Sequence, residues 1–343
     1  MRHPWVNTLL LVLLLAQLAT GLLGLVNGHS DQRWLYWLHD AGGWAIVALL
    51  LWKGAVIVDS LARRKRAPAQ RPVYLVLTGL LVATLATGFI WTSAGRITIS
   101  GYSLMTVHHV LAYILVGLMA THVLYMRFIL SVPDAHDRRA FMRLAAVSFT
   151  GVVAWQLSGV AKAILDLPGA ARRFTGSYET GSHTGRFPTV SWFSDDPNRI
   201  DGETWRLRVE GQVAHSFELD YAEVERRTRK SREALIDCTG GWYSVQIWEG
   251  FPLADLLDEA GVEDGADSVS LVSVTGYSRR FSLDEARGFM LATRVGDREL
   301  THGHGYPLRL VASGHRGFDW VKWVVRVEVN SDSEWFQPPV PLQ

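Results

Sequence analysis

Hydrophobic residues are spread unevenly along this chain. Long runs of Leu, Val, Ala and Gly dominate from Trp5 to about Ile164, whereas charged residues recur at short intervals from Arg172 onward. Five runs are apolar enough and long enough to cross a bilayer core of about 30 Å as helices. They cover residues 5–26, 35–58, 73–91, 104–130 and 144–164, and the last is the weakest because it carries Gln156 and Lys162. The pattern predicts an all-α membrane half followed by a water-exposed half.

The second half shows a different periodicity. Residues 204–210 alternate between apolar and polar side chains, which is typical of a half-exposed strand. Similar patterns predict strands over 268–274, 308–312 and 324–329 and helices over 220–229, 252–260 and 283–289. Because strands and helices follow one another in mixed order, we expect an α+β domain rather than a doubly wound sheet. Residues 166–185, rich in Gly, Ser and Thr, predict a linker before it.

The loops between the apolar runs predict how the chain crosses the membrane. Basic residues gather between the second and third runs and between the fourth and fifth: Arg63, Arg64, Lys65, Arg66 and Arg71, then Arg127, Arg138, Arg139 and Arg143. The opposite side carries only Arg33 and Arg96. Cytoplasmic loops are the basic ones, so we expect a cytoplasmic N-terminus and an outer location for everything after the fifth run.

Composition narrows the classes of function. A chain of 343 residues with a net charge of +1 predicts two domains and gives no reason to expect a nucleic-acid partner. The single cysteine, Cys238, cannot form an internal disulfide. It follows a short apolar run, 234–236, and precedes Thr239, Gly240 and Gly241, where missing side chains let a large group approach the backbone. Cys238 is a small buried hydrophobe, a nucleophile or a thiolate metal ligand.

Two further patches combine glycines with cations. Residues 301–309 contain His304 and Arg309, and residues 314–323 contain Arg316 and Lys322. Exposed backbone N–H groups beside cations suit a phosphate, although either patch alone is also typical of a solvated basic loop. The sequence has no Walker or dinucleotide-binding fingerprint, so we do not expect a nucleotide-binding fold.

Taken together, these segments resemble the molybdenum domain of the sulfite oxidase family, including the branch that contains the periplasmic methionine sulfoxide reductase catalytic subunit. The matching motifs are Cys238-x-x-x-Trp242, residues 248–253, residues 304–309 and residues 317–322. The resemblance covers nearly all of residues 183–335. It implies that Cys238 is the thiolate on molybdenum and that molybdopterin is held by His183, Thr275, His304, Arg309, Arg316, Trp320, Val321 and Lys322. The arginine-rich segment that follows the cysteine in sulfite oxidases is absent, which argues against sulfite as the substrate.

Histidines inside the apolar runs need a function, because polar side chains at membrane depth are costly. His39 opens the second run, while His108 and His122 lie on one face of the fourth, about 21 Å apart along a helix axis. We pair His39 with His108 near the outer side and His122 with His3 near the inner side. Interfacial histidines bonded to carbonyls or headgroups are the alternative. The pattern resembles the four-helix bacterial cytochrome b561 family, which implies one or two b-type haems and exchange with quinone or quinol.

The fifth run begins with a candidate export signal. Arg138, Arg139, Phe141 and Arg143 precede a weakly apolar stretch, which resembles a twin-arginine signal. The alternative is a plain basic loop on the cytoplasmic side. A twin-arginine route carries folded, cofactor-loaded domains, as an outer molybdenum domain would require.

These patterns combine into one hypothesis. Residues 1–133 are a transmembrane four-helix haem bundle, residues 134–170 a signal-like segment with an anchor helix, and residues 171–343 an α+β molybdopterin-binding domain. The chain is predicted to be a bacterial inner-membrane oxidoreductase, with its molybdenum domain in the periplasm, that transfers an oxygen atom to or from a small substrate. The alternatives are a thiol-dependent catalyst at Cys238 and a non-catalytic outer module.

Overall fold

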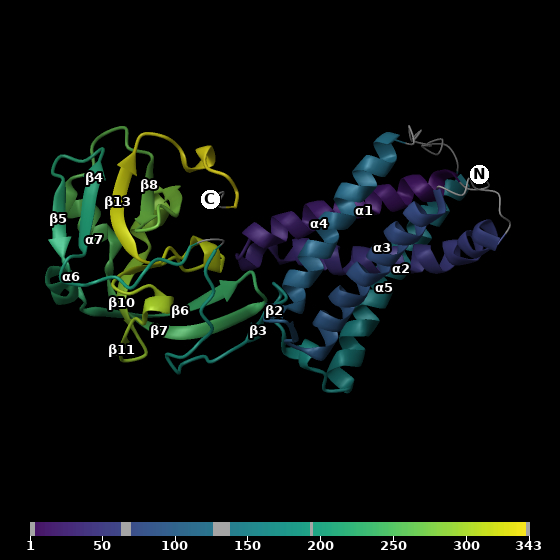
Figure 1. Ribbon diagram of the computed structural model, residues 1–343, viewed down its shortest axis with the longest axis horizontal. Coiled ribbons are helices and arrows are strands. Elements are labelled where there is room, and N and C mark those ends of the chain that lie inside the picture. The colour runs from purple at the N-terminus through teal and green to yellow at the C-terminus, as the bar shows by residue number, and fades with distance from the viewer. Residues whose placement is uncertain (1–3, 63–69, 126–137, 193–194, 341–343) are drawn as a thin grey trace. The chain divides into compact units, whose positions relative to one another are not determined.

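The computed structural model describes residues 4–62, 70–125, 138–192 and 195–340. It divides into two compact units, Met1–Tyr178 and Glu179–Gln343 (Figure 1). The division falls inside the stretch that the sequence predicts as a linker. The first unit is helical apart from one short β-hairpin, and the second is built mainly of strands.

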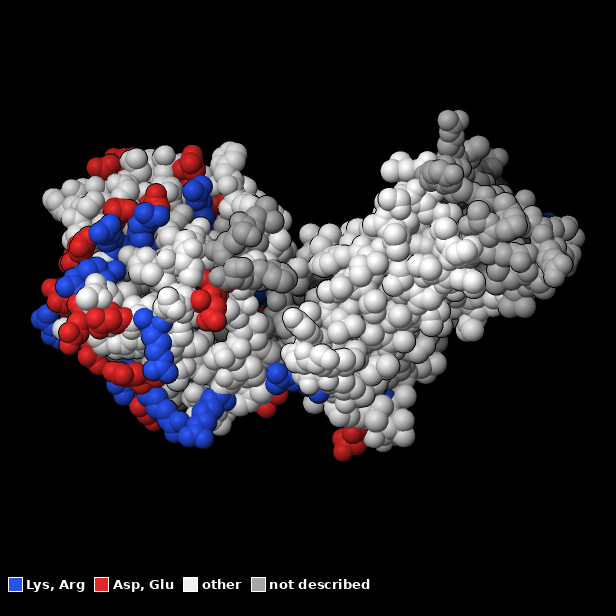
Figure 2. All heavy atoms as spheres, viewed as in Figure 1, with Lys and Arg blue, Asp and Glu red and all other residues white. Residues whose placement is uncertain are grey.

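The helical unit contains the five predicted apolar segments. They are α1 (Pro4–Val26), α2 (Arg33–Ala62), α3 (Gln70–Ala94), α4 (Leu104–Tyr125) and α5 (Arg138–Ile164). Among the described residues, five helices are long and apolar enough to cross a membrane. Charged side chains are sparse on the visible face of these helices, whereas they are dense on the second unit (Figure 2). A helix satisfies its own backbone hydrogen bonds, which is the requirement for a chain in lipid.

The helices of this unit pack against one another through buried apolar side chains and, between α2 and α5, through a glycine. Buried leucines and an isoleucine from α1, α2, α3 and α4 form one cluster: Leu14, Ile46, Leu77, Leu81 and Leu115. Helix α5 packs against α2, where Gly151 permits the approach, since a Cβ there would lie 2.8 Å from the Ala41 carbonyl oxygen. The helices that carry His39 and His108, α2 and α4, therefore belong to one packed unit.

Residues 166–178 are folded onto the helices and are not a free linker. Arg172 forms an ion pair with Asp40 of α2 at 2.7 Å. The Trp91 indole donates to the Gly176 carbonyl at 2.8 Å, and the Tyr178 hydroxyl donates to the Trp91 carbonyl. Its glycines serve close contact and turning: a Cβ on Gly169 would lie 2.0 Å from the Thr92 carbonyl oxygen, and Gly176 has a φ of 85°.

The second unit contains two sheets. The first has six strands in the order β11 (Arg298–Glu299), β10 (Met290–Val295), β7 (Trp242–Pro252) and β3 (Tyr178–Glu179), with β12 (Arg309–Val311) on β10 and β6 (Lys230–Cys238) on β7. The second has five, in the order β5 (Phe217–Asp220), β4 (Arg206–Gly211), β13 (Val324–Asn330), β8 (Ser268–Ser273) and β9 (Ser278–Ser282). Only β4 and β13 are paired in parallel among the five strands of that sheet. With α6 (Tyr221–Arg227), α7 (Leu253–Ala260) and α8 (Leu283–Arg287), the unit is α+β, as predicted.

One hydrophobic core joins both sheets of this unit. Leu207 and Val209 of β4 are fully buried, as the alternation of residues 204–210 predicts. Helix α7 buries Leu253, Leu256 and Leu257 on one face. The sequence prediction identifies only the apolar end of β6, because the charged residues at its start point outward. Strand β6 forms a long antiparallel hairpin with β7 and ends at Cys238, which is paired with Trp242.

Candidate functional site

Cys238 lies at the end of β6, where the hairpin turns into β7. Its sulfur is half-buried and accepts a hydrogen bond from the Gly240 amide at 3.3 Å. Gly241 has a φ of 88°, a conformation that glycine adopts without strain. Burial raises the pKa of the Cys238 thiol, against the Gly240 hydrogen bond and the charge of Arg316, which lower it. Since the thiolate is the nucleophile, a raised pKa does not favour a free thiol catalyst.

A buried ion pair joins the β6–β7 hairpin, which carries Cys238, to the predicted patch at residues 314–323. The Asp237 and Arg316 side chains are 2.7 Å apart and at most 4% exposed. Their backbones also form an isolated bridge. The next residue, Gly317, begins the short 3-10 helix η4 (Gly317–Asp319), and a Cβ there would lie 3.2 Å from the Cys238 Cα. The patch containing Arg316 thus packs directly against the cysteine.

Arg309, from the patch at residues 301–309, lies beside Lys322, from the patch at residues 314–323. Gly305 lies between them, since a Cβ there would be 3.0 Å from the Arg309 Cβ and 3.1 Å from the Lys322 Cβ. Arg309 donates to the His304 and Trp320 carbonyls at 2.9 and 3.3 Å, with Trp248 under its guanidinium. Lys322 donates to the Ser191 hydroxyl at 2.9 Å.

The Arg309 and Lys322 side chains are shielded from water, and the negative charge near them does not balance their positive charge. Desolvation lowers the pKa of Arg309 to about 9. Desolvation and the charge of Arg309 lower the pKa of Lys322 to about 8, while Asp195, Asp196 and Cys238 act in the opposite direction. Desolvation also lowers the pKa of His304 to about 4. Because an anion would relieve the repulsion, this region is suited to a phosphate or a similar group.

Thr275 is connected to the same charges through Asp195, a residue that the sequence reasoning did not identify. The Thr275 hydroxyl donates to the Asp195 carboxylate at 2.5 Å. Burial raises the pKa of Asp195, against the hydrogen bond from Thr275 and the charge of Lys322. No sequence signal separates Asp195 from its exposed neighbour Asp196, because only the fold buries one of them.

The remaining predicted cofactor-binding residues of this unit are Trp320, Val321 and His183. The Trp320 and Val321 side chains are at most 2% exposed and belong to the core. His183 has a φ of 59° and an exposed side chain 3.8 Å from Glu233. Glu233 is on β6, five residues before Cys238, or about 16 Å along a strand. The structure therefore brings Cys238, Arg316, Arg309, His304 and Lys322 together, but it does not bring His183 to the cysteine.

Several buried donors in this region have no hydrogen-bond partner among the described residues. They are the Trp242 and Trp320 indole nitrogens and the Nε atoms of Arg309 and Arg316. Buried polar groups are nearly always paired, so a concentration of unpaired donors indicates a ligand rich in acceptor atoms. A single soft thiolate beside cations and donors fits a molybdenum bound to an anionic organic ligand.

A pocket of about 500 Å³ lies next to this cluster. Its lining is Thr180, Gly185, Arg186, Phe187, Pro188, Val295, Arg298, Glu299, Thr301 and His304. His304 links it to the cluster, and the Phe187 ring packs on the His304 ring with centroids 4.1 Å apart.

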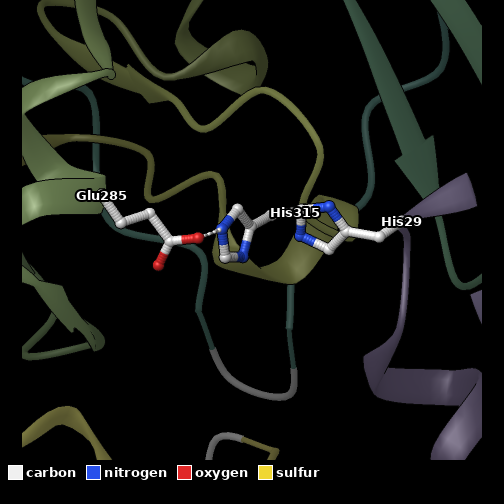
Figure 3. A group of neighbouring side chains, drawn as sticks. All are labelled: His29, Glu285 and His315. Carbon is white, nitrogen blue, oxygen red and sulfur yellow. Dashed lines mark hydrogen bonds and ion pairs between the residues drawn. The ribbon is translucent and has the colours of Figure 1, made fainter. Parts of the chain in front are cut away.

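A second polar network supports the Arg316 loop. His315 contacts the Glu285 carboxylate at 2.7 Å, as drawn in Figure 3, and the Asp319 carboxylate at 3.4 Å. Arg279 contacts the other oxygen of Asp319 at 2.7 Å. Although burial alone would lower it, hydrogen bonds to Asp319 and Glu285 raise the pKa of His315 to about 9. The network fixes both ends of η4, whose first residue packs against Cys238.

In the helical unit, His39 and His108 face one another. Their ring centroids are 6.2 Å apart. Nδ1 of His108 lies 2.9 Å from the Thr84 carbonyl, and Nδ1 of His39 lies 3.0 Å from the Thr20 hydroxyl. Gly21 and Gly88 leave room for the two rings, because a Cβ at either would lie 3.3 or 3.1 Å from the histidine. In both side chains Nε2 is the nitrogen left for a metal.

Of the other two predicted histidines, His122 lies near the end of α4, with its ring 5.3 Å from the Tyr74 ring. His3 is outside the described residues. His109, which the sequence does not predict as a ligand, has its ring centroid 6.2 Å from that of His108 and 6.5 Å from that of Tyr113.

Comparison with known proteins assigns the second unit. Residues 194–336 match the family model described as "oxidoreductase molybdopterin binding domain". The chain is 29% identical over 153 residues to the uncharacterized oxidoreductase YuiH of Bacillus subtilis, an alignment that covers 44% of this chain and 77% of that protein. It is 32% identical to the NADH nitrate reductase of Spinacia oleracea and 28% identical to the NADPH nitrate reductase of Mycosarcoma maydis. Those alignments cover 38% of this chain and only 18% of each reductase.

Among solved structures, the sulfane dehydrogenase SoxCD of Paracoccus pantotrophus matches at 26% identity with a TM-score of 0.38. The match covers 39% of this chain and 40% of that chain.

Proposed function

We propose that this enzyme transfers an oxygen atom to or from a small substrate at Cys238, in a site of sulfite oxidase type within residues 194–336, which match an oxidoreductase molybdopterin-binding domain. The observation that carries this proposal is the convergence of the cysteine hairpin with two cationic patches. Cys238 holds the molybdenum, while Arg309, Lys322 and His304 hold the anionic part of the molybdopterin. When bound, the cofactor supplies the two-electron redox chemistry of oxygen-atom transfer.

The protein residues position, charge and shield this site. The Asp237–Arg316 ion pair and the hydrogen bond from Gly240 fix where the Cys238 sulfur lies. Arg309 and Lys322 supply positive charge in a region that water barely reaches, which strengthens their interaction with an anion. Thr275 and Asp195 hold Lys322 within the same charge network.

The helical unit supplies the route for electrons. In this proposal His39 and His108 would hold the iron of a b-type haem, which would supply electron exchange with the quinone pool. Support comes from their facing rings and from the contacts at Nδ1, since metal-ligating histidines usually bond their second nitrogen to a carbonyl or another oxygen. A second haem at His122 and His3 stays a prediction, because His3 is outside the described residues.

The membrane arrangement belongs to the same proposal. The five apolar helices span a bacterial inner membrane, with the N-terminus in the cytoplasm and the molybdenum domain in the periplasm. Support comes from the basic loops and from the Arg138–Arg139 pair, which opens α5.

Replacement of the cysteine tests the central claim. In Cys238→Ser we expect oxygen-atom transfer to fall below detection, because a hydroxyl is a poor ligand for molybdenum, while the haem absorption spectrum stays unchanged. The assay is a screen of sulfoxides, N-oxides and sulfite with an artificial electron carrier, together with molybdenum content per chain. Ser231→Ala, an exposed change near the start of β6, is the matched control.

Two results would contradict the proposal. Wild-type turnover in Cys238→Ser would exclude the thiolate as the metal ligand. Folded wild-type protein without molybdenum, isolated from a host that makes the cofactor, would favour a thiol catalyst or a non-catalytic module.

A further inference from the structure

Trp242, the first residue of β7, contains a buried hydrogen-bond donor that the fold does not use. Its side chain is 3% exposed, and its indole nitrogen has no hydrogen-bond partner among the described residues. Among the other buried indoles of this unit, Trp248 donates to the Ala234 carbonyl at 3.3 Å and Trp323 to the His302 carbonyl at 2.8 Å, whereas those of Trp205 and Trp320 are unpaired like that of Trp242. Buried tryptophans usually find an acceptor for this group. Trp242 is the unpaired indole that lies directly across the hairpin from Cys238, which points to an acceptor in a ligand bound there.

The position of the indole indicates where that acceptor lies. A Cβ built on Gly240 would be 3.5 Å from the Cys238 sulfur and 4.0 Å from both Cδ1 and Nε1 of Trp242. The sulfur and the N–H edge of the indole therefore border the same space beside Gly240. Because Gly240 has no side chain, the place where a methyl group would contact both the sulfur and the indole is left unfilled.

The neighbouring carboxylate does not offer an acceptor on this side. Cys238 and Trp242 are directly paired across the hairpin, so their side chains are on the same face. Asp237 precedes Cys238 by one residue and points to the opposite face, where it is paired with Arg316 at 2.7 Å.

We propose that Trp242 donates a hydrogen bond from Nε1 to an acceptor atom of the molybdopterin cofactor held at Cys238, and so positions it. This inference rests on the proposed function. It makes Trp242 a cofactor-binding residue and not only a part of the core, although its ring also packs against Phe187 with centroids 6.0 Å apart. In cofactor-free protein the buried N–H is unpaired, so its contribution to stability arises only on loading.

The experiment compares Trp242→Phe with Trp205→Phe in the full-length chain. Trp205 is a matched control because it is 4% exposed and also has an unpaired indole nitrogen, but it packs against Tyr221 beside the other sheet. Each protein is produced with the cofactor, and also in a host that cannot make molybdopterin. The unfolding temperature, the molybdenum retained after dialysis and the visible absorption of the loaded protein are measured.

We expect cofactor loading to raise the unfolding temperature of the wild type and of Trp205→Phe by the same amount. In Trp242→Phe we expect at most half of that rise, a several-fold loss of molybdenum on dialysis and a shifted visible absorption band. An unchanged rise and an unchanged band in Trp242→Phe would overturn the inference. Failure of the wild type to take up molybdopterin would instead overturn the proposed function.

A second pair of variants covers the case in which Trp242→Phe does not fold without cofactor. Trp242→His keeps a ring N–H in a smaller side chain, and Trp242→Leu removes it. If cofactor loading raises the unfolding temperature more in Trp242→His than in Trp242→Leu, the hydrogen bond is supported. Equal rises in the two variants overturn it.

Discussion

At the scale of single residues, the cations of the site differ in whether a carboxylate is paired with them. Arg316 has the Asp237 carboxylate at 2.7 Å, whereas Arg309 donates only to carbonyls and Lys322 mainly to a carbonyl and a hydroxyl. Removing a charge from water is costly unless it is paired. The excess positive charge is therefore a structural cost that a bound anion offsets, which explains why these cations gather at one place.

His315 provides a pH-dependent prediction at this scale. Its pKa is raised to about 9 in the folded protein, against about 6.5 for an unperturbed histidine. A raised pKa means that the stabilisation is fully present below pH ~6.5 and is lost as the pH rises through 9. We expect His315→Gln to lower the unfolding free energy by about 1–3 kcal/mol at pH 6 and by much less at pH 10.

Thermal unfolding of the full chain across this pH range is the measurement. His215→Gln changes an exposed histidine of the same unit and serves as the control. A difference between wild type and His315→Gln that is constant from pH 6 to pH 10 would show that the charged form of His315 does not stabilise the fold.

At the scale of elements, close backbone contacts decide which segments are ordered. The β6–β7 hairpin places Cys238 opposite Trp242, and η4 closes over the turn because Gly317 has no side chain. The segment 166–178 is held on the helical unit in the same way. Its 3-10 helix η2 (Pro168–Ala171) contains Gly169, where a Cβ would lie 2.0 Å from the Thr92 carbonyl oxygen.

Gly169→Ala therefore tests whether this segment is folded or free. We expect the added methyl group to displace η2 from α3, to lower the unfolding temperature by several degrees and to speed cleavage by trypsin after Arg172 or Arg173. Gly159→Ala in α5 is the control, since a Cβ there meets nothing within 4 Å. Equal stability and equal cleavage in both variants would mean that residues 166–178 behave as a linker.

At the scale of the whole molecule, the two units are adapted to different surroundings. The helices expose apolar side chains such as Leu51 at 77% and Phe149 at 71%, which lipid would cover. The second unit has its own core and a charged surface (Figure 2). In the proposed arrangement, the first unit lies in a membrane and the second is moved across it.

Replacement of Arg138 and Arg139 by lysine tests the export route. We expect the double variant to retain its second unit in the cytoplasm, protected from protease added to spheroplasts, because the twin-arginine signal needs the arginines and not only their charge. Arg143→Lys is the control. Normal protease exposure of the double variant would show that the pair acts only as a topology signal.

Replacement of His108 tests the haem assignment. We expect His108→Ala to lose the haem between α2 and α4 and to stop electron transfer between the molybdenum site and quinone, because one axial ligand is removed. Haem per chain and reduction of the haem by a molybdenum-side donor are the measurements. His109→Ala is the control. Unchanged haem content and unchanged electron transfer in His108→Ala would contradict the assignment.

The sequence alone determined the local features of this protein. Length and apolarity predicted the five helices, because a helix completes its hydrogen bonds within its own segment. Alternation predicted β4, β8, β12 and β13 to within a few residues. The resemblance identified Cys238 and the cationic patches, because each motif is a short run of residues with its own chemistry.

Only the tertiary structure decided which of these residues meet. Hydrophobic patterns do not encode the contact of Gly317 with Cys238, the pairing of Asp237 with Arg316, or the burial of Asp195 rather than Asp196. The same holds for the approach of His183 to Glu233. The predicted role of His183 in holding the cofactor stays a prediction. Each of these outcomes depends on segments far apart in the chain, whose contacts are set by sheet register and side-chain packing.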